Sequence, residues 1–149
     1  MKTNLKTVIA KFFILLCFTF QVNAQTSYVD KKGNVHLWGE TNIESLKEGD
    51  YKEWYTKNYE EHYSALTTKD NSLFKDVTVR VFIGTWCGDT KYLLPRFIKT
   101  WEKMGLSENQ IEIIALHNED EFYKLGPNKE TEGLNIHRIP TFIFEKQGK

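Results

Sequence analysis

The chain has 149 residues, which is enough for one domain of ordinary size and for two only if both are minimal. Apolar residues make up 40% of the chain and charged residues 27%, so we expect a packed core and exclude a disordered, collagen-like or polytopic membrane protein. The 20 basic residues balance the 20 acidic ones, so no net charge attracts nucleic acid or an anionic bilayer.

Residues 1–24 have the three-part pattern of a secretory signal. Three lysines and no acidic residue precede the apolar run 12–18, and side chains of small or modest size stand at 22–24, where a signal peptidase would cut. The alternative is a membrane anchor, but the apolar run is shorter than the roughly 20 residues that a spanning helix needs. A lipid anchor on Cys17 is disfavoured because Leu16 stands where such signals carry a small residue. We therefore expect export to the periplasm or the cell exterior, without membrane attachment after cleavage.

Signal cleavage would change both the charge and the thiol content of the chain. The expected mature chain has 17 basic and 20 acidic residues, a net charge of −3. It keeps one of the two cysteines, Cys87, so it can form neither an intramolecular disulfide nor a four-thiolate zinc site.

Residues 25–73 are expected to form an N-terminal extension that begins with a hairpin. Two short β-prone segments, 28–30 and 35–38, flank the turn residues Gly33 and Asn34.

A helix is expected to follow the hairpin. Asp50 and Glu53 have the spacing of a capping box, and apolar side chains then recur at helical intervals as far as Leu66. An aromatic stripe of this kind could form a ligand platform, but its spacing favours a core face that packs on a sheet. The stripe consists of Tyr51, Trp54, Tyr55, Tyr59, His62, Tyr63 and Leu66.

The remaining residues, 74–149, alternate between strand and helix patterns. The β-branched run 77–83 predicts a central strand, residues 86–90 lead into a helix that ends at Gly105, and the apolar segment 111–116 predicts a second strand. The expected apolar face of the helix consists of Leu93, Leu94, Phe97, Ile98, Trp101 and Met104.

The last part of the chain predicts a short helix at 119–125, an irregular stretch from 126 to 128, a strand at 141–144 and a turn at 147–149. The whole order predicts an α/β fold, a central mixed sheet with a parallel pair, flanked by helices. Because a further strand should follow the final turn, we expect the C-terminus to be truncated.

Cys87 is the candidate nucleophile. It directly follows a predicted strand and opens a helix, where backbone N–H groups and the helix dipole stabilise a thiolate. Asp89 opposes that effect with a nearby negative charge, Lys91 could offset the acid, and the Thr90 hydroxyl could donate a hydrogen bond to the sulfur. The alternative is a buried, inert cysteine, which a position between Trp86 and a glycine disfavours.

These residues resemble the thioredoxin family over about residues 74–149, roughly half of the chain. The matching features are the strand 77–83, Trp86-Cys87-Gly88 at the start of a helix, the strand 111–116 and Ile139-Pro140-Thr141 before a strand. Pro95 also stands where such proteins bend the active-site helix. The resemblance implies a thioredoxin-like fold whose C-terminal strand and helix are missing from this chain.

The resemblance also implies a binding site for extended peptides. Pro140 is then expected to be cis and to lie beside Cys87, and the backbone of Ile139 to pair with an added peptide strand. Trp86, Ile139, Pro140 and Thr141 are the expected substrate-binding residues.

Two departures from the family pattern limit the chemistry. Thr90 stands where thioredoxins carry a second cysteine, and Val81 where they carry a buried carboxylate. A single thiol can form a mixed disulfide, but release then requires another thiol from the substrate, a small molecule or a reductase partner. We therefore expect monothiol or isomerase-like thiol–disulfide exchange on protein or peptide disulfides, with Cys87 and Thr90 as catalytic residues and without a cofactor. The alternative is a non-catalytic peptide-binding module on the same fold.

Other chemistries fit the residues less well. A peroxiredoxin would carry a proline and a hydroxyl residue at the positions of Arg80 and Gly84, and the tryptophan before Cys87 argues against a monothiol glutaredoxin. No metal site is expected, since the four histidines show no ligand spacing. The resemblance brings only His137 near the thiol, as a candidate proton donor or charge partner.

Overall fold

The structure is a computed structural model that describes residues 26–146. The expected secretory signal, Cys17 and the expected final turn at 147–149 lie outside the described residues.

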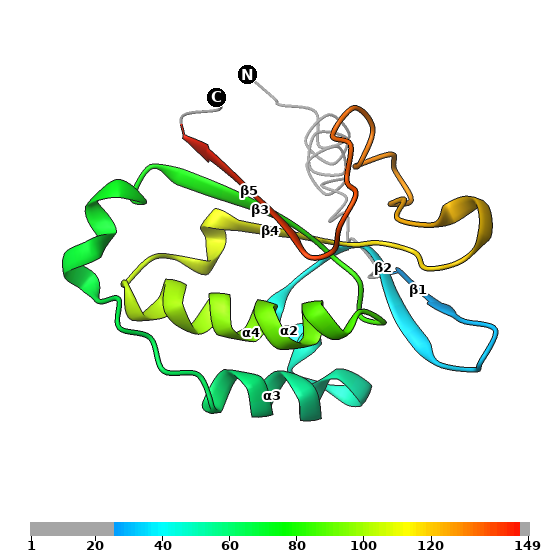
Figure 1. Cartoon of the computed structure of the whole chain (residues 1–149), viewed down its shortest axis with the longest axis horizontal. Helices are drawn as coiled ribbons and strands as arrows, with labels where there is room; N and C mark the ends of the chain where they lie inside the picture. The colour runs from blue at the N-terminus through cyan, green and yellow to red at the C-terminus, as the bar shows by residue number, and fades with distance from the viewer. Residues whose placement is uncertain (1–25, 147–149) are drawn as a thin grey trace, which may run out of the picture.

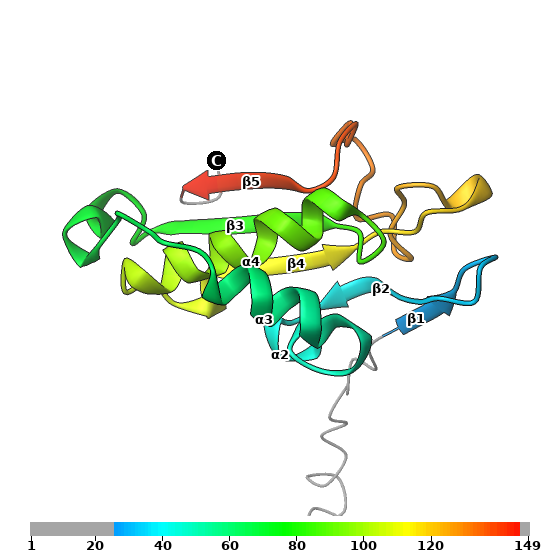
Figure 2. The same ribbon diagram turned by 60° about the horizontal axis from the view of Figure 1, so that its bottom comes forward.

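The described chain is an α/β fold built on a mixed sheet of five strands. The strands are β1 (Thr26–Val29), β2 (Val35–Thr41), β3 (Val77–Ile83), β4 (Ile111–Ala115) and β5 (Thr141–Lys146). They lie side by side in the order β1-β2-β4-β3-β5, as Figure 2 shows. β3 and β4 are parallel, as expected, whereas the other neighbours pair antiparallel. The expected N-terminal hairpin is therefore β1 and β2, and β2 extends the sheet by pairing with β4.

The helices α2 (Ile43–Leu46), α3 (Lys52–Glu60) and α4 (Gly88–Lys103) lie on the same side of the sheet. α3 and α4 pack against each other and cover the same face of the sheet (Figure 1 and Figure 2). Short 3-10 turns occur at Gly49–Tyr51, Thr68–Leu73, Glu108–Gln110 and Asp120–Phe122. Among residues 26–146, no helix is long and apolar enough to cross a bilayer.

The core is divided between the two faces of the sheet because the side chains of β3 alternate. Val79, Val81 and Ile83 join the larger cluster between the sheet and α4, together with Leu94, Ile98 and Trp101. Phe82 points to the opposite face, where it forms a smaller cluster with Ile114, Leu116 and Ile139. The segment 126–140 lies on that second face, away from α3 and α4 (Figure 1). It thereby carries Ile139 and Pro140 to the sheet.

The helix expected from Asp50 to Leu66 is shorter than predicted. Asp50 lies inside a 3-10 turn, so it cannot cap α3, and the residue before α3 makes no side-chain cap hydrogen bond. The helix ends at Glu60, and Tyr63 is 86% exposed. The aromatic face of α3, with Tyr55 buried at its centre, joins the core cluster that the sheet and α4 form, as its spacing predicts.

Two further expectations about helices are wrong. Residues 119–125 form only the 3-10 turn Asp120–Phe122, because Asp120 and Lys124 have positive φ and the chain folds back to pair Lys124 N–H with the His117 carbonyl. Leu93, expected on the apolar face of α4, is 43% exposed. The rest of that face is confirmed, and Gly105 ends the helix with φ +71°.

Candidate functional site

A tight turn between β3 and α4 places Cys87 at the start of the helix. The Cys87 N–H donates to the Gly84 carbonyl at 2.9 Å, which closes the turn directly after β3. Cys87 has extended φ and ψ and is the N-cap residue of α4, but its side chain makes no capping hydrogen bond. The sulfur is therefore not engaged by the helix N-terminus and is left to interact elsewhere.

The Cys87 sulfur lies against the carbonyl group that precedes Pro140. Sγ donates to the Ile139 carbonyl oxygen at 3.3 Å, and the Ile139–Pro140 peptide bond is cis, as the resemblance implies. Cys87 is half-buried, whereas Ile139 is only 7% exposed. The fold thus brings the thiol and the cis-proline together although they are 53 positions apart in the sequence.

Trp86 is held on the sheet side of the same turn. Its indole Nε1–H donates to the Leu116 carbonyl at 2.9 Å, and its ring lies 6.1 Å from that of Tyr123, centroid to centroid. Thr141, also expected in the site, begins β5 opposite Phe82, and its hydroxyl donates to the Arg138 carbonyl at 2.6 Å. The expected substrate-binding residues therefore surround the end of β3, where the chain turns into α4.

The structure gives Thr90 a different role from the one expected. Its side chain is fully buried, and its hydroxyl oxygen accepts the Gly84 N–H at 3.3 Å. Within the described chain no hydrogen bond joins this hydroxyl to the Cys87 sulfur. Thr90 therefore stabilises the turn that carries Cys87 by its hydrogen bond with the Gly84 N–H, and not by a hydrogen bond to the sulfur.

Within residues 26–146, His137 forms no hydrogen bond with the Cys87 thiol either. It lines a hollow with Tyr123 and Asn135, and its backbone carbonyl accepts from the Lys124 ammonium. No contact between His137 and Cys87 is found in the part of the chain that the structure covers. The same residues hold no group of three or more metal-ligating side chains.

The sequence does not predict a series of buried hydrogen bonds that lies behind the turn and joins Thr85, His36 and Asp30. Thr85 Oγ1 lies 3.2 Å from Nδ1 of His36, and Nε2 of His36 lies 3.3 Å from an Asp30 carboxylate oxygen. Because the Asp30 carboxylate can only accept, Nε2–H of His36 donates to it, and in the neutral imidazole Nδ1 then accepts from the Thr85 hydroxyl, whose oxygen accepts the Leu37 N–H. Thr85 and His36 are 49 positions apart, so no local sequence pattern marks this contact.

Asp30 is itself tightly bound at the end of this series of hydrogen bonds. Hydrogen bonds from the side chain and the backbone of Asn34 hold the pKa of the Asp30 carboxyl far below its usual range, with further donors from Lys32 N–H and His36. The carboxylate therefore serves as a fixed end point for the hydrogen bonds of the hairpin loop.

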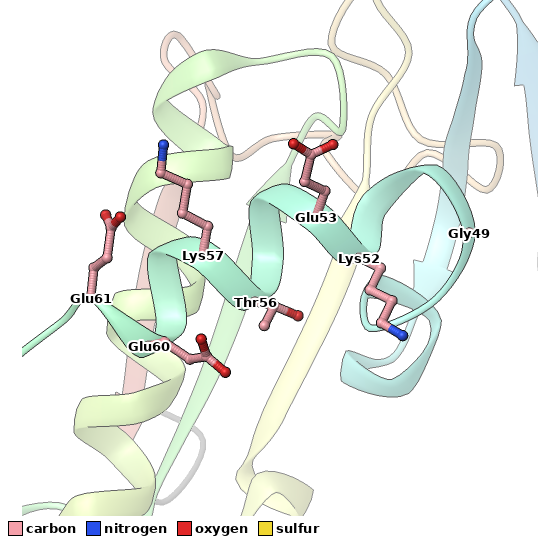
Figure 3. Close-up of a pocket in the computed structure, with 7 residues that line it drawn as sticks. All are labelled: Gly49, Lys52, Glu53, Thr56, Lys57, Glu60 and Glu61. Carbon is pink, nitrogen blue, oxygen red and sulfur yellow. The ribbon is translucent and has the colours of Figure 1, made fainter.

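Two of the hollows among residues 26–146 lie along α3 or beside the thiol turn. One, of about 590 Å³, follows α3 and is lined by Lys52, Glu53, Lys57 and other polar residues, which point outward from one short segment (Figure 3). The other, of about 600 Å³, is bounded by six residues of the β1–β2 hairpin and by residues beside Cys87, including Trp86 and Lys91. We call this second hollow the hairpin pocket. Of these two hollows in residues 26–146, the hairpin pocket reaches the turn that carries Cys87.

Comparisons of the chain with models of protein families, with curated proteins and with solved structures find no match.

Proposed function

We propose that this is an exported thioredoxin-like protein that carries out thiol–disulfide exchange through Cys87. The observation that supports this most directly is the placement of a half-exposed thiol 3.3 Å from the carbonyl that precedes a cis-proline. The strand order around the parallel pair of β3 and β4, with α4 following β3, fits the same fold family. The signal-like pattern of residues 1–24 supports export.

The proposed reaction needs one thiol of the protein and two partners. The Cys87 thiol first loses its proton to water, and the thiolate attacks one sulfur of a substrate disulfide. The Cys87–substrate S–S bond forms as the substrate S–S bond breaks, and the second substrate sulfur leaves as a thiolate. A second thiolate then attacks the substrate sulfur of the mixed disulfide and returns Cys87 to the thiolate. The buried threonine at position 90 cannot supply that second thiol.

The hydrogen bond between Cys87 and Ile139 links this chemistry to peptide binding. In the thiol form, the Ile139 carbonyl accepts the S–H proton. Once the sulfur is ionised or joined to a substrate it has no proton to donate, and the carbonyl can accept a backbone N–H from an extended peptide. A substrate peptide would thus gain a backbone hydrogen bond to the Ile139 carbonyl at the step at which its sulfur becomes bonded to Cys87.

The test is to trap the mixed disulfide. We expect the chain lacking residues 1–24 to form a one-to-one adduct with a small aromatic disulfide, detected by mass spectrometry, and to react faster than free cysteine at neutral pH. Cys87→Ser must abolish the adduct, and a reducing thiol must remove it. An intact Cys87 that forms no adduct would refute the proposed function.

A peptide-binding module without redox chemistry is the second candidate. The pairing of half-buried Trp86 with the exposed ring of Tyr123 favours it, because this aromatic surface adjoins the turn before α4. Comparing wild type with Cys87→Ala separates the two functions: peptide binding without disulfide exchange in wild type, unchanged in Cys87→Ala, supports the binding module, whereas exchange by wild type that Cys87→Ala loses supports catalysis.

A further inference from the structure

The hairpin pocket lies next to the turn that carries the thiol. Thr85, Trp86 and Lys91, which flank Cys87 in the chain, all line it, and the Lys91 N–H donates to the Cys87 carbonyl at 3.1 Å. Its volume of about 600 Å³ is within the range of small-molecule sites. The other lining residues come from the hairpin, from the segment around the start of α3 and from Asn118.

The pocket wall next to the thiol turn is rigid and polar. His36 and Thr85 line it, and both are buried and joined to each other by a hydrogen bond of 3.2 Å. Polar side chains that are fixed by buried hydrogen bonds hold their positions without a ligand, so binding would require little ordering. His36 belongs to the N-terminal hairpin and Thr85 to the turn, so this part of the pocket forms only when both elements are in place.

The charges of the pocket favour a carboxylate beside the thiol turn. Lys91 is half-buried, and across residues 26–146 its ammonium group forms neither an ion pair nor a hydrogen bond with a side chain. The Asp30 carboxylate is occupied by donors from Asn34, Lys32 N–H and His36. Asp50, in the 3-10 turn before α3, adds a negative charge to the lining. Two lysines line the pocket: Lys32 belongs to the hairpin loop, and Lys91 lies in α4, four positions after Cys87, so Lys91 is the positive group next to Cys87 in the chain.

We infer that the hairpin pocket binds the second thiol of the exchange reaction, and that this thiol is a small molecule carrying a carboxylate that pairs with Lys91. The inference rests on the proposed function, which requires an external thiol. The incoming thiolate forms a disulfide with the substrate sulfur, the bond from that sulfur to Cys87 breaks, and its electron pair stays on Cys87. No other oxidant or reductant is consumed.

The experiment compares release rates for two small thiols. Cys87 is first joined to 2-mercaptoethanol by reaction with its symmetrical disulfide, and the adduct is then released with 3-mercaptopropionate or with 2-mercaptoethanol. Lys91→Gln should lower the ratio of the first rate to the second by about three- to fivefold, the size of one partly exposed charge pair. The ratio between two thiols cancels any general effect of the substitution on the Cys87 sulfur.

Lys103→Gln is the matched control. It removes the same charge from the same helix but at its exposed far end, about 18 Å along the axis from Lys91. This variant should leave the rate ratio unchanged. Equal ratios in wild type and Lys91→Gln, or an equal fall in both variants, would overturn the inference.

A binding measurement separates failure of the pocket from failure of the proposed function. In Cys87→Ser, which cannot exchange disulfides, 3-(methylthio)propionate should shift the indole N–H resonances of Trp54 and Trp86, which both line the pocket. The double variant Cys87→Ser/Lys91→Gln should show none of these shifts. If wild type forms no mixed disulfide, the proposed function falls; if these shifts are absent, the pocket inference falls, whatever the outcome of the exchange reaction.

Discussion

At the scale of single residues, the turn that carries Cys87 depends on a close approach at Gly84. A Cβ atom at this position would lie 2.6 Å from Cε2 and 2.8 Å from Nε1 of the Trp86 indole. The same indole is fixed on its other side by the hydrogen bond to the Leu116 carbonyl. Glycine at 84 therefore ends β3 and also makes room for the aromatic ring beside the thiol.

Gly84→Ala should displace the Trp86 indole and destabilise the fold by about 1–3 kcal/mol, as overpacking of a filled space does. Tryptophan emission should change together with the unfolding midpoint. Gly88→Ala is the control, because a Cβ there meets no atom within 4 Å and the residue already begins α4. Unchanged stability and emission in Gly84→Ala would contradict this account of the turn.

The sequence predicts some site residues better than others. Cys87 and Pro140 are found by motif, because a strand followed by Trp-Cys-Gly and a later Ile-Pro-Thr each sit in a recognisable local pattern. The partner of the Thr90 hydroxyl is not found in this way, because it depends on the rotamer of a buried side chain relative to Gly84 N–H. Contacts of this kind require the folded turn.

At the scale of secondary structure, hydrophobic periodicity predicts α4 well and α3 poorly. α4 has a buried stripe with a terminating glycine, and both features are visible in the sequence. The apolar spacing of α3 continues past Glu60 toward Leu66, but the chain leaves the helix and His62 contacts the Thr100 hydroxyl oxygen at 3.0 Å. Periodicity cannot show that a tertiary contact ends a helix.

The end of α4 brings two carboxyl groups together, Glu102 of the helix and Glu108 of the following 3-10 turn. Burial raises the pKa of Glu108, and a hydrogen bond with Glu102 raises it further, while Lys47 acts in the opposite direction. Glu102 also accepts a hydrogen bond from the Tyr59 hydroxyl of α3. The folded state therefore holds a proton on Glu108 more tightly than the unfolded state does.

Glu108→Gln should therefore stabilise the protein at pH 7 and have no such effect near pH 4. The raised pKa means that the stability contributed by protonated Glu108 is complete below its ordinary pKa and is lost as the pH rises through the folded-state pKa. Glutamine stays neutral throughout, and the expected gain at pH 7 is about 0.5 kcal/mol, the scale of exposed charge contacts. Urea unfolding at both pH values measures it, with the exposed Glu121→Gln as control. A gain of equal size at pH 4 would show that charge is not the cause.

At the scale of the whole molecule, the N-terminal hairpin and the thiol turn form one polar assembly. The Asp30–His36–Thr85 chain crosses from the β1–β2 loop to the end of β3, and Tyr28 links the hairpin to the segment after β4 through its hydrogen bonds with Asn118. The sequence predicts the hairpin and the parallel pair separately, since each has a local pattern. Their joining through β2 and β4 and through buried side chains is a long-range contact that a single sequence does not reveal.

Thr85→Val tests whether this assembly couples the hairpin to the turn. Valine keeps the shape of threonine but leaves the Leu37 N–H and the His36 Nδ1 without the hydroxyl, so we expect a loss of about 1–3 kcal/mol, the cost of unpaired buried polar groups. Amide hydrogen exchange should become faster at Leu37 in the hairpin and at Cys87 in the turn, because both are held through residues next to the lost contact. Thr85→Ser retains the hydroxyl and should keep both amides protected. If Thr85→Val were as stable and as protected as Thr85→Ser, the hydroxyl would not couple the hairpin to the turn, and strand pairing and contacts such as Tyr28–Asn118 would hold the hairpin.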